Sequence, residues 1–348
     1  MSKRTFENAL IVRTDRIGDV VLTLPMIPVL RESLPGIRIS MLLRSYTAAL
    51  VEGTPGLDHV VPYDRSGKPK EFLALLSELQ AQKFDLVIVS HPTLRIALLT
   101  ALAGIPVRVG SGYRWYSFLF NRKVFEHRKT AEKHEAAYNI SLLQAIDIRS
   151  DSIPRIELSL PSSANDAAAV EVRRLGLSEI DRFVVLHPGS GGSARDWNPR
   201  NFGVLAAALV GEGLKVVVTG STEERRLVEA VVEASGGKAM QSVGMMPLKV
   251  LAAFIGRAHL FVSNSTGPLH IAAAVGTPVI AFYPPIRECS PRRWGPLTDD
   301  QVVFTAVSSL CPRCNGGPCQ GNDCMEQISV EDVLGAAHTL LTPKERSY

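Results

Sequence analysis

The sequence predicts an α/β protein with two doubly wound, parallel-sheet domains. Three observations predict this class. The chain has 348 residues, more than one hydrophobic core usually organises. Short apolar runs alternate with helical patterns, as expected for parallel strands that are buried on both faces and connected by helices. This alternation lapses once and then starts again, so we expect two domains of the same type.

The first half supplies five expected strands and three expected helices. The apolar runs that predict strands lie at residues 9–13, 38–43, 59–63, 84–90 and 106–110. The helical patterns lie at residues 20–33, 71–82 and 94–103. Because strand and helix alternate, each pair of strands is expected to run parallel.

The alternation lapses at residues 149–166, R-S-D-S-I-P-R-I-E-L-S-L-P-S-S-A-N-D, where prolines and small polar residues predict a linker. The second half then repeats the architecture without repeating residue identities. Its expected strands lie at residues 183–188, 214–220, 259–263 and 278–283. Its expected helices lie at residues 198–211, 223–233, 247–256, 267–275 and 329–341. We therefore place the two domains at residues 1–160 and 161–348.

Composition narrows the class of protein. Hydrophobic residues make up 46% of the chain and charged residues 21%, which is typical of a globular protein. The net charge of +4 is too small to indicate a nucleic-acid partner. No apolar run reaches the roughly 18 residues that a membrane helix requires, and the first residues, M-S-K-R-T-F-E-N-A-L-I-V-R, lack the pattern of a signal peptide. A cytoplasmic location is expected.

Glycine and small polar residues follow four of the expected strands. The segments are T-D-R-I-G-D-V, P-G-S-G-G-S-A-R-D-W, G-S-T-E-E and N-S-T-G-P-L-H. A helix N-terminus stabilises an anion, so these loops are candidates for holding a phosphate; ordinary helix capping is the alternative at each one. A Walker P-loop and a G-x-G-x-x-G after the first strand are both missing from the sequence, which disfavours a nucleotide triphosphatase and a dehydrogenase.

Four long segments carry a family resemblance: residues 10–42, 84–110, 184–202 and 262–283. Within them, G-D-V and T-G-P-L-H-I-A-A are the specific motifs. In order along the chain, they resemble the heptosyltransferase family of bacterial lipopolysaccharide synthesis, glycosyltransferase family 9. The resemblance implies a GT-B fold of two Rossmann-like domains, with the acceptor on residues 1–160 and the sugar nucleotide on residues 161–348. It also implies transfer of a heptose from ADP-heptose to the lipopolysaccharide inner core, with inversion at the anomeric carbon.

An inverting transfer needs a base that takes the proton of the acceptor hydroxyl. The resemblance assigns this role to the acid of the G-D motif, Asp19; simple capping of the helix is the alternative, and Asp15 is the rival acid. The resemblance also places Arg195 where the family commonly has a lysine, so that a cation faces the leaving diphosphate. A solvated surface arginine is the alternative for Arg195.

The donor candidates follow strands of the second domain. The hydroxyl groups of Ser190, Ser193 and Thr266, with the helix N–H groups around Gly267, would complete a diphosphate site. Pro268, which has no N–H of its own, is a further donor-binding candidate beside them. Ser265 stands where many family members have an aspartate, which puts the identity of the sugar in doubt. His270 matches the family histidine and is expected to face the sugar; packing inside the helix is the alternative. The ribose and base candidates are Glu223, its neighbour Glu224, and Met245.

The acceptor candidates lie in the first domain at Arg16, Gly18, His91, Arg95 and Arg114. Residues 108–133 contain seven Lys and Arg with interleaved aromatic residues. This pattern predicts contact with a lipid-linked, anionic saccharide or with the cytoplasmic face of the inner membrane. A solvated basic loop is the alternative. Single-stranded nucleic acid also suits such a pattern, but no nucleic-acid module supports it.

Cysteines are concentrated near the C-terminus. Cys311, Cys314, Cys319 and Cys324 form C-x2-C-x4-C-x4-C, a count that suits a tetrahedral zinc ion although the spacing is unusual. Reduced thiols or a local disulfide are the favoured alternative. With no D-x-D triplet in the sequence, we expect a metal-independent enzyme that needs no cofactor besides its sugar-nucleotide substrate. The other hypotheses are transfer of a different sugar to a surface polysaccharide and an inactive sugar-nucleotide-binding homologue, the latter motivated by Ser265.

Overall fold

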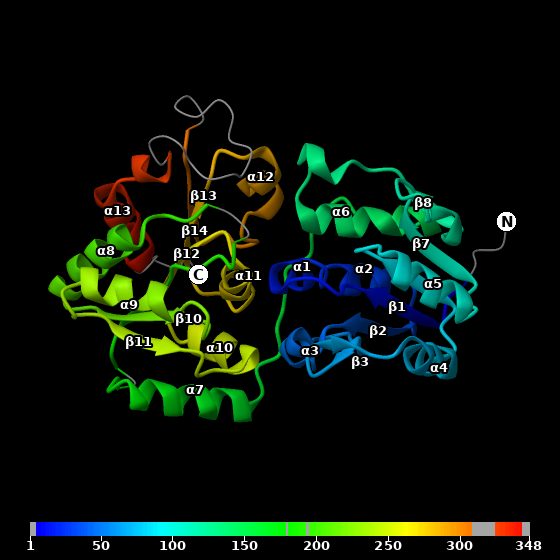
Figure 1. The fold of residues 1–348 in the computed structure, drawn as a ribbon, viewed down its shortest axis with the longest axis horizontal. Coiled ribbons are helices and arrows are strands. Elements are labelled where there is room, and N and C mark those ends of the chain that lie inside the picture. The colour runs from blue at the N-terminus through cyan, green and yellow to red at the C-terminus, as the bar shows by residue number, and fades with distance from the viewer. Residues whose placement is uncertain (1–4, 179, 193–194, 308–323, 343–348) are drawn as a thin grey trace, which may run out of the picture. The chain divides into compact units, whose positions relative to one another are not determined.

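The computed structural model describes residues 5–178, 180–192, 195–307 and 324–342 (Figure 1). The chain forms two compact units, Met1–Ser159 and Leu160–Tyr348. Within the described residues, each unit contains one six-stranded sheet in which all neighbouring strands are parallel. The α/β class with parallel sheets, predicted from the sequence, is confirmed. In this part of the chain, no helix has the length and apolar character needed to cross a membrane.

The first unit has the strand order β3-β2-β1-β6-β7-β8. Its strands are β1 (Asn8–Val12), β2 (Arg38–Leu43), β3 (His59–Pro62), β6 (Leu86–Val89), β7 (Val107–Ser111) and β8 (Arg122–Val124), with a small hairpin of β4 (Asp64–Arg65) and β5 (Lys68–Pro69). Its α-helices are α1 (Ile17–Val21), α2 (Met26–Ser33), α3 (Ser45–Val51), α4 (Phe72–Gln82), α5 (Leu94–Leu102) and α6 (Glu135–Ser141). Short 3-10 helices lie at η1 (Ser117–Leu119), η2 (Arg128–Thr130) and η3 (Leu142–Ile146).

The structure corrects one helix of this unit. The expected single helix at residues 20–33 is two helices, α1 and α2, separated by a turn at residues 22–25. Pro25 immediately precedes α2. Because proline has no N–H and its ring clashes with the preceding turn, a continuous helix through this position is disfavoured.

Helices α4 and α5 cover one face of the first sheet. Their buried side chains, such as Leu75 and Ile96, pack against Leu10, Val12 and Val87 of the sheet. On another side of the unit, the side chain of Asn139 in α6 donates to the backbone oxygen of Leu22 at 3.0 Å. Helix α6 is thereby attached to the turn that ends α1.

The second unit has the strand order β11-β10-β9-β12-β13-β14. Its strands are β9 (Phe183–His187), β10 (Lys215–Gly220), β11 (Met240–Val243), β12 (Leu260–Asn264), β13 (Val279–Tyr283) and β14 (Gln301–Thr305). Its α-helices are α7 (Ser162–Arg174), α8 (Pro199–Gly211), α9 (Arg225–Ala234), α10 (Leu248–Ile255), α11 (Gly267–Ala274), α12 (Pro291–Trp294) and α13 (Val330–Leu341). The 3-10 helices are η4 (Arg287–Cys289) and η6 (Cys324–Gln327).

The expected linker at residues 149–166 is too long at its second end, because α7 begins at Ser162. The first turn of α7 contains small polar residues, which the sequence pattern assigned to the linker. The side chain of Asn165 donates to the backbone oxygen of Leu160 at 3.0 Å. Side chains of Ser, Asn and Asp bond to nearby backbone groups both in loops and in the first turn of a helix, so their presence alone does not separate the two.

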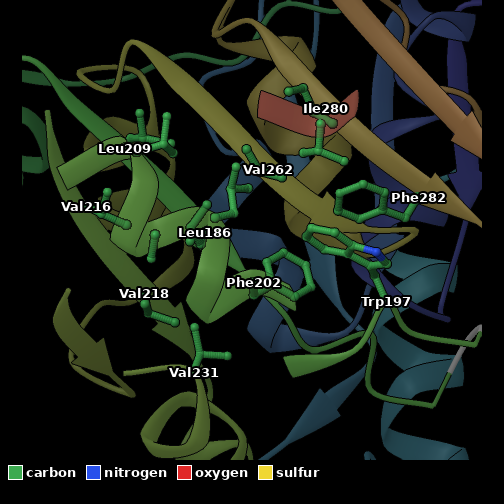
Figure 2. Close-up of a cluster of buried hydrophobic side chains, with 14 of the residues drawn as sticks. Leu186, Trp197, Phe202, Leu209, Val216, Val218, Val231, Val262, Ile280 and Phe282 are labelled. Carbon is green, nitrogen blue, oxygen red and sulfur yellow. The ribbon is translucent and has the colours of Figure 1, made fainter. Parts of the chain in front are cut away.

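An aromatic cluster is part of the buried core of the second unit (Figure 2). Trp197 is fully buried, and its ring centroid lies 5.0 Å from that of Phe202 and 4.5 Å from that of Phe282. The indole Nε1 donates to the backbone oxygen of Ile328 at 2.9 Å. This bond satisfies the one polar group of the side chain, as a buried tryptophan requires, and connects the loop before α8 to the segment before α13.

Both sheets reverse their strand order at the first strand of the unit. In the first sheet the reversal lies between β1 and β6, and in the second it lies between β9 and β12. Ligands of open α/β sheets bind outside the carboxyl ends of the strands at such a switch point. The residues that follow Val12, Val89, His187 and Asn264 are therefore the places to look for a site in each unit.

Candidate active site

In the first unit, charged side chains gather where β1 ends. Arg13 follows β1 and is 3% exposed. Its Nε donates to Asp15 Oδ1 at 2.8 Å, and its Nη2 donates to Asp19 Oδ1. Its Nη1 donates to Glu135 Oε1 at 3.2 Å and to Asn139 Oδ1 at 3.1 Å. We call these five residues the Arg13 cluster, in which one buried guanidinium contacts three carboxylates.

Asp19 lies inside α1, and its carboxylate does not cap that helix. The residue at the N-cap is Arg16, and no side chain caps the helix there. The Asp19 carboxylate contacts Arg13 instead. Burial raises the pKa of Asp19 to about 6; Arg13 opposes this shift, whereas the negative charges of Asp15 and Glu135 add to it. A carboxylate with a pKa near the working pH is suited to general-base catalysis.

Asp15, the rival acid, has a different environment. Its Oδ2 lies 3.0 Å from Nδ1 of His91, which follows β6. Burial by itself raises the pKa of Asp15, but the hydrogen bond with His91 and the charge of Arg13 outweigh it, so the pKa is lowered. The pKa values of these two neighbouring acids are therefore moved in opposite directions, which suits them to different protonation states near neutral pH. Asp19 is the better suited of the two to accept a proton near neutral pH.

The structure brings some of the expected acceptor residues together and leaves others apart. His91 joins the Arg13 cluster through Asp15, and Gly18 is buried in α1 next to Asp19. Arg95 instead lies over the ring of Phe72, with its guanidinium carbon 5.5 Å from the ring centroid, and donates to the backbone oxygen of Lys70. Arg16 and Arg114 are exposed.

In the second unit, Asn264 organises the carboxyl end of the sheet. This residue ends β12 and is fully buried. Its Nδ2 donates to the backbone oxygen of Pro188 at 2.6 Å, and its Oδ1 accepts from the backbone N–H of Trp197 at 2.7 Å. One side chain therefore fixes both ends of the loop that contains the expected diphosphate ligands.

That loop carries the first group of donor candidates. Ser190 is buried and forms hydrogen bonds with Asp196, whose pKa burial raises to about 6. Arg195 is partly buried, with its Nε inside the unit, so it is not a freely solvated surface arginine. Ser193 lies outside the described residues.

The N-terminus of α11 carries the second group. Thr266 occupies the N-cap position but its side chain does not cap the helix, and Gly267 and Pro268 form its first turn. Ser265 donates its N–H to the backbone oxygen of Phe282 at 3.2 Å. Its side chain forms a hydrogen bond with the hydroxyl of Tyr283.

His270 is 4% exposed, which fits the alternative of packing inside α11.

The structure separates the two candidate ribose acids. Glu224, at the N-cap of α9, accepts from the backbone N–H of Ser221 at 2.8 Å, and its Oε2 lies 4.0 Å from Nε2 of His187 at the end of β9. Glu223 is exposed. Met245, also exposed, follows β11. Of the two acids, Glu224 is the one that lies against the loop after β9.

The cysteine cluster falls mostly outside the described residues, which exclude Cys311, Cys314 and Cys319. Cys324 is described and is buried in η6. Among the residues that the structure describes, no group of three or more His, Cys, Asp or Glu side chains is arranged to hold a metal ion.

Several residues at these sites were not singled out from the sequence. Arg13 gives a weak signal, because it is the one charged residue in the otherwise apolar run at residues 9–13. Glu135, Asn139 and Asn264 give none, because the partners that connect them to these sites lie 67 to 126 residues away along the chain.

Solved structures with the same architecture give the fold class. The glycosyl transferase family 9 protein from Veillonella parvula superposes with a TM-score of 0.84 at 24% identity, covering 97% of this chain and 98% of that one. The Escherichia coli heptosyltransferase WaaC with ADP-2-deoxy-2-fluoro heptose gives a TM-score of 0.68 at 21% identity, covering 95% and 99%. The fold is therefore GT-B, as the resemblance implied.

Sequence comparison identifies the family. The model of glycosyltransferase family 9 (heptosyltransferase) matches residues 72–323. A putative glycosyltransferase of Haemophilus influenzae is 31% identical over 94% of this chain and 95% of its own length. Lipopolysaccharide heptosyltransferase 3 of Escherichia coli K12 is 26% identical over 93% and 95%. The chain belongs to glycosyltransferase family 9.

Proposed function

We propose that this protein is an inverting heptosyltransferase that moves a heptose, or a closely related sugar, from an ADP-linked donor to the inner core of lipopolysaccharide. The observation that carries the proposal is the position of Asp19: a largely buried carboxylate with a raised pKa, beside the switch point of the first sheet. The family and the curated relatives that are lipopolysaccharide heptosyltransferases support the choice of sugar and acceptor.

In the proposed reaction, Asp19 takes the proton of an acceptor hydroxyl as the oxygen attacks the anomeric carbon. The new C–O bond forms on the face opposite the bond to the diphosphate, so the configuration inverts. The bond between the anomeric carbon and the diphosphate oxygen breaks, and ADP leaves with the electron pair. Asp19 must be ionised to act, so activity should fall as the pH drops through about 6.

The second unit would bind the donor. Ser190, Thr266 and the N–H of Gly267 would donate to the diphosphate, and Arg195 would balance its growing negative charge. The hydroxyl of Thr266 is suited to this because it does not cap α11. Glu224 is the better placed of the two acids for the ribose hydroxyls. The serine at position 265 is the reason to test donors other than ADP-heptose.

The first unit would meet the acceptor and the cytoplasmic face of the inner membrane. We define the aromatic–basic surface by its exposed residues, which are Tyr113, Arg114, Trp115, Phe118, Arg122, Lys123 and Phe125. The rings of Tyr113 and Phe125 meet edge to face at 5.6 Å. Exposed aromatic rings among cations suit a lipid headgroup region that is anionic.

ADP release tests the proposed reaction. The protein is incubated with ADP-heptose and lipopolysaccharide lacking the outer core, and ADP is measured with time. Asp19→Asn should lower kcat by roughly 10²–10⁴-fold with little change in the donor KM. The matched control is Asp58→Asn, which replaces another aspartate of the same unit that pairs with an arginine, Arg31.

If the Asp19→Asn variant releases ADP as fast as the wild type, Asp19 is not the general base. Turnover by the wild type with another sugar nucleotide alone would support the alternative of a different surface saccharide. Donor binding by calorimetry without turnover on any acceptor would support an inactive binding homologue.

A further inference from the structure

The Arg13 cluster contains more charged groups than the proposed base, Asp19, and its counterion, Arg13. Glu135 is fully buried in the first turn of α6, although a buried carboxylate is costly without partners. It has two: Arg13, and Arg128 of η2, whose Nη1 also donates to Glu135 Oε1. Arg128 donates to Asn139 Oδ1 at 3.1 Å as well. Glu135 and Asn139 are therefore held by two guanidinium groups at once.

Asn139 connects this pair to the helix that carries Asp19. While its Oδ1 accepts from Arg13, its Nδ2 donates to the backbone oxygen of Leu22 at 3.0 Å and to Thr23 Oγ1 at 3.1 Å. Thr23 in turn donates to the backbone oxygen of Asp19 at 2.8 Å. Helix α6 thus fixes both the guanidinium that contacts the Asp19 carboxylate and the backbone on which that carboxylate is mounted.

We propose that Glu135 and Asn139 are positioning residues for the transfer: they hold Arg13 so that its Nη2 fixes the orientation and charge state of Asp19. The proposal rests on the proposed function of Asp19 as base. It assigns a role in the reaction to α6, a helix that lies far from Asp19 along the chain.

The charges that face Asp19 come from every element around it. Arg13 at the end of β1 lowers its pKa, and the carboxylates of Asp15 and Glu135 raise it. Asp15 is itself paired with His91 after β6, and Arg128 of η2 pairs with Glu135. On the side of α3, the Tyr46 hydroxyl donates to the backbone oxygen of Asp15, and Arg44 donates to that of Thr14. Arg16 adds a further cation next to Asp15 in the chain.

Two substitutions in this cluster should move the titration of Asp19 in opposite directions. Glu135→Gln removes a negative charge and keeps the shape, so the pKa of Asp19 should fall by roughly 0.5–1 unit. Arg128→Gln removes the second cation from Glu135, so the pKa should rise. A loss of fold or of packing would not produce shifts of opposite sign. Arg128 is partly exposed, so this variant is expected to fold even if Glu135→Gln does not.

Two readouts measure the effect on the full-length protein. The first is the carbon-13 titration of aspartate carboxyl groups by nuclear magnetic resonance, with the Asp19 signal assigned from its loss in Asp19→Asn. The second is the pH dependence of kcat, whose acid limb should move with the titration. In Glu135→Gln the plateau kcat should also fall roughly tenfold while the donor KM stays unchanged, because a loosened Arg13 misplaces the base.

The control is Glu78→Gln, which removes a carboxylate that pairs with Lys70 elsewhere in the unit and should move neither readout. Opposite shifts in the two variants would support the positioning role. An Asp19 titration that is the same in both folded variants as in the wild type would overturn it, even if Asp19→Asn is inactive. If the titration moves but Asp19→Asn retains full turnover, the base role fails, and the positioning role falls with it.

Discussion

At the scale of single residues, the second unit contains an acid whose ionisation opposes folding. Burial raises the pKa of Asp196 to about 6, from an ordinary value of 3.8. Between these two pH values the folded chain holds a proton that the unfolded chain has lost. The free energy of unfolding therefore falls as the pH rises through this window, by up to about 3 kcal/mol from this group.

Asp196→Asn should remove that pH dependence. Relative to the wild type, the variant should gain up to about 3 kcal/mol of unfolding free energy between pH 4 and pH 7, measured by urea denaturation at each pH. Asp181→Asn is the control, because hydrogen bonds from Ser178 lower the pKa of Asp181 below its ordinary value of 3.8, so between about pH 4 and pH 7 the pH dependence of this variant should match that of the wild type. A parallel pH dependence of Asp196→Asn and wild type would contradict the prediction.

The candidate site shows which residues a sequence can indicate. Asp19 and Thr266 lie in motifs directly after strands, so local sequence marks them. Arg13 also follows a strand, but its importance depends on Glu135, which is 122 residues further along the chain. Asn264 appears in the sequence as one more small polar residue, and its role is visible only when the loops at Pro188 and Trp197 are seen beside it.

At the scale of elements, α8 and α9 pack closely because of one glycine. A Cβ atom added to Gly203 in α8 would lie 2.4 Å from the Cβ of Ala234 and 2.8 Å from the backbone oxygen of Val231. Neither neighbour is a flexible side-chain end that can move aside.

Gly203→Ala should therefore destabilise the protein by about 1–3 kcal/mol in urea denaturation, despite the higher helix propensity of alanine. Gly211→Ala lies at the end of the same helix with no heavy atom within 4 Å of the added Cβ. It should leave stability unchanged or raise it by up to about 1 kcal/mol. Equal effects at the two positions would show that the helices can separate.

Three strands of the six-stranded sheets that the sequence did not indicate share a physical cause. The strands β8, β11 and β14 carry polar or charged residues, as in R-K-V and M-Q-S-V. Each of the three is the outermost strand at an edge of its sheet. Edge strands are paired and buried less than central ones, so their sequences need not be continuously apolar. The central strands, which position the sites, were the ones the apolar pattern indicated.

At the scale of the whole molecule, the two units have separate sheets and separate cores. The buried clusters described here draw on residues 10–120 in the first unit and 184–337 in the second. Each unit thus has what an independently folding domain needs.

Residues 160–348 expressed alone should therefore unfold cooperatively and bind ADP. At an ADP concentration about 100 times Kd, the free energy of unfolding of this fragment should rise by about 2.7 kcal/mol, measured by denaturation with and without ADP. Residues 1–159 serve as the control and should not respond to ADP. Stabilisation of the full chain but not of the fragment would count against donor binding by the second unit alone.

The aromatic–basic surface should attach the whole protein to anionic vesicles. Trp115 and Phe118 are 75% and 68% exposed. The wild type should sediment with vesicles containing phosphatidylglycerol and less with phosphatidylcholine alone, and high salt should weaken binding. The double variant Trp115→Ser, Phe118→Ser should bind roughly tenfold more weakly or worse.

Leu73→Ser is the matched control, because Leu73 is 76% exposed on α4 of the same unit. Its vesicle binding should equal that of the wild type. Equal binding of the wild type to both kinds of vesicle, or preference for single-stranded nucleic acid in competition, would contradict the assignment of this surface to a membrane.

The central position of β1 and β9 has a consequence for motion. Each strand is hydrogen-bonded on both sides, β1 to β2 and β6, and β9 to β10 and β12. Backbone amides in such strands exchange with deuterated water only when the whole unit opens. Arg13 directly follows β1, and Ser190 lies three residues after β9. The proposed site residues are therefore attached to strands whose backbone amides should exchange most slowly. Substrates should therefore change deuterium uptake in the loops and leave the strands beneath them as they are.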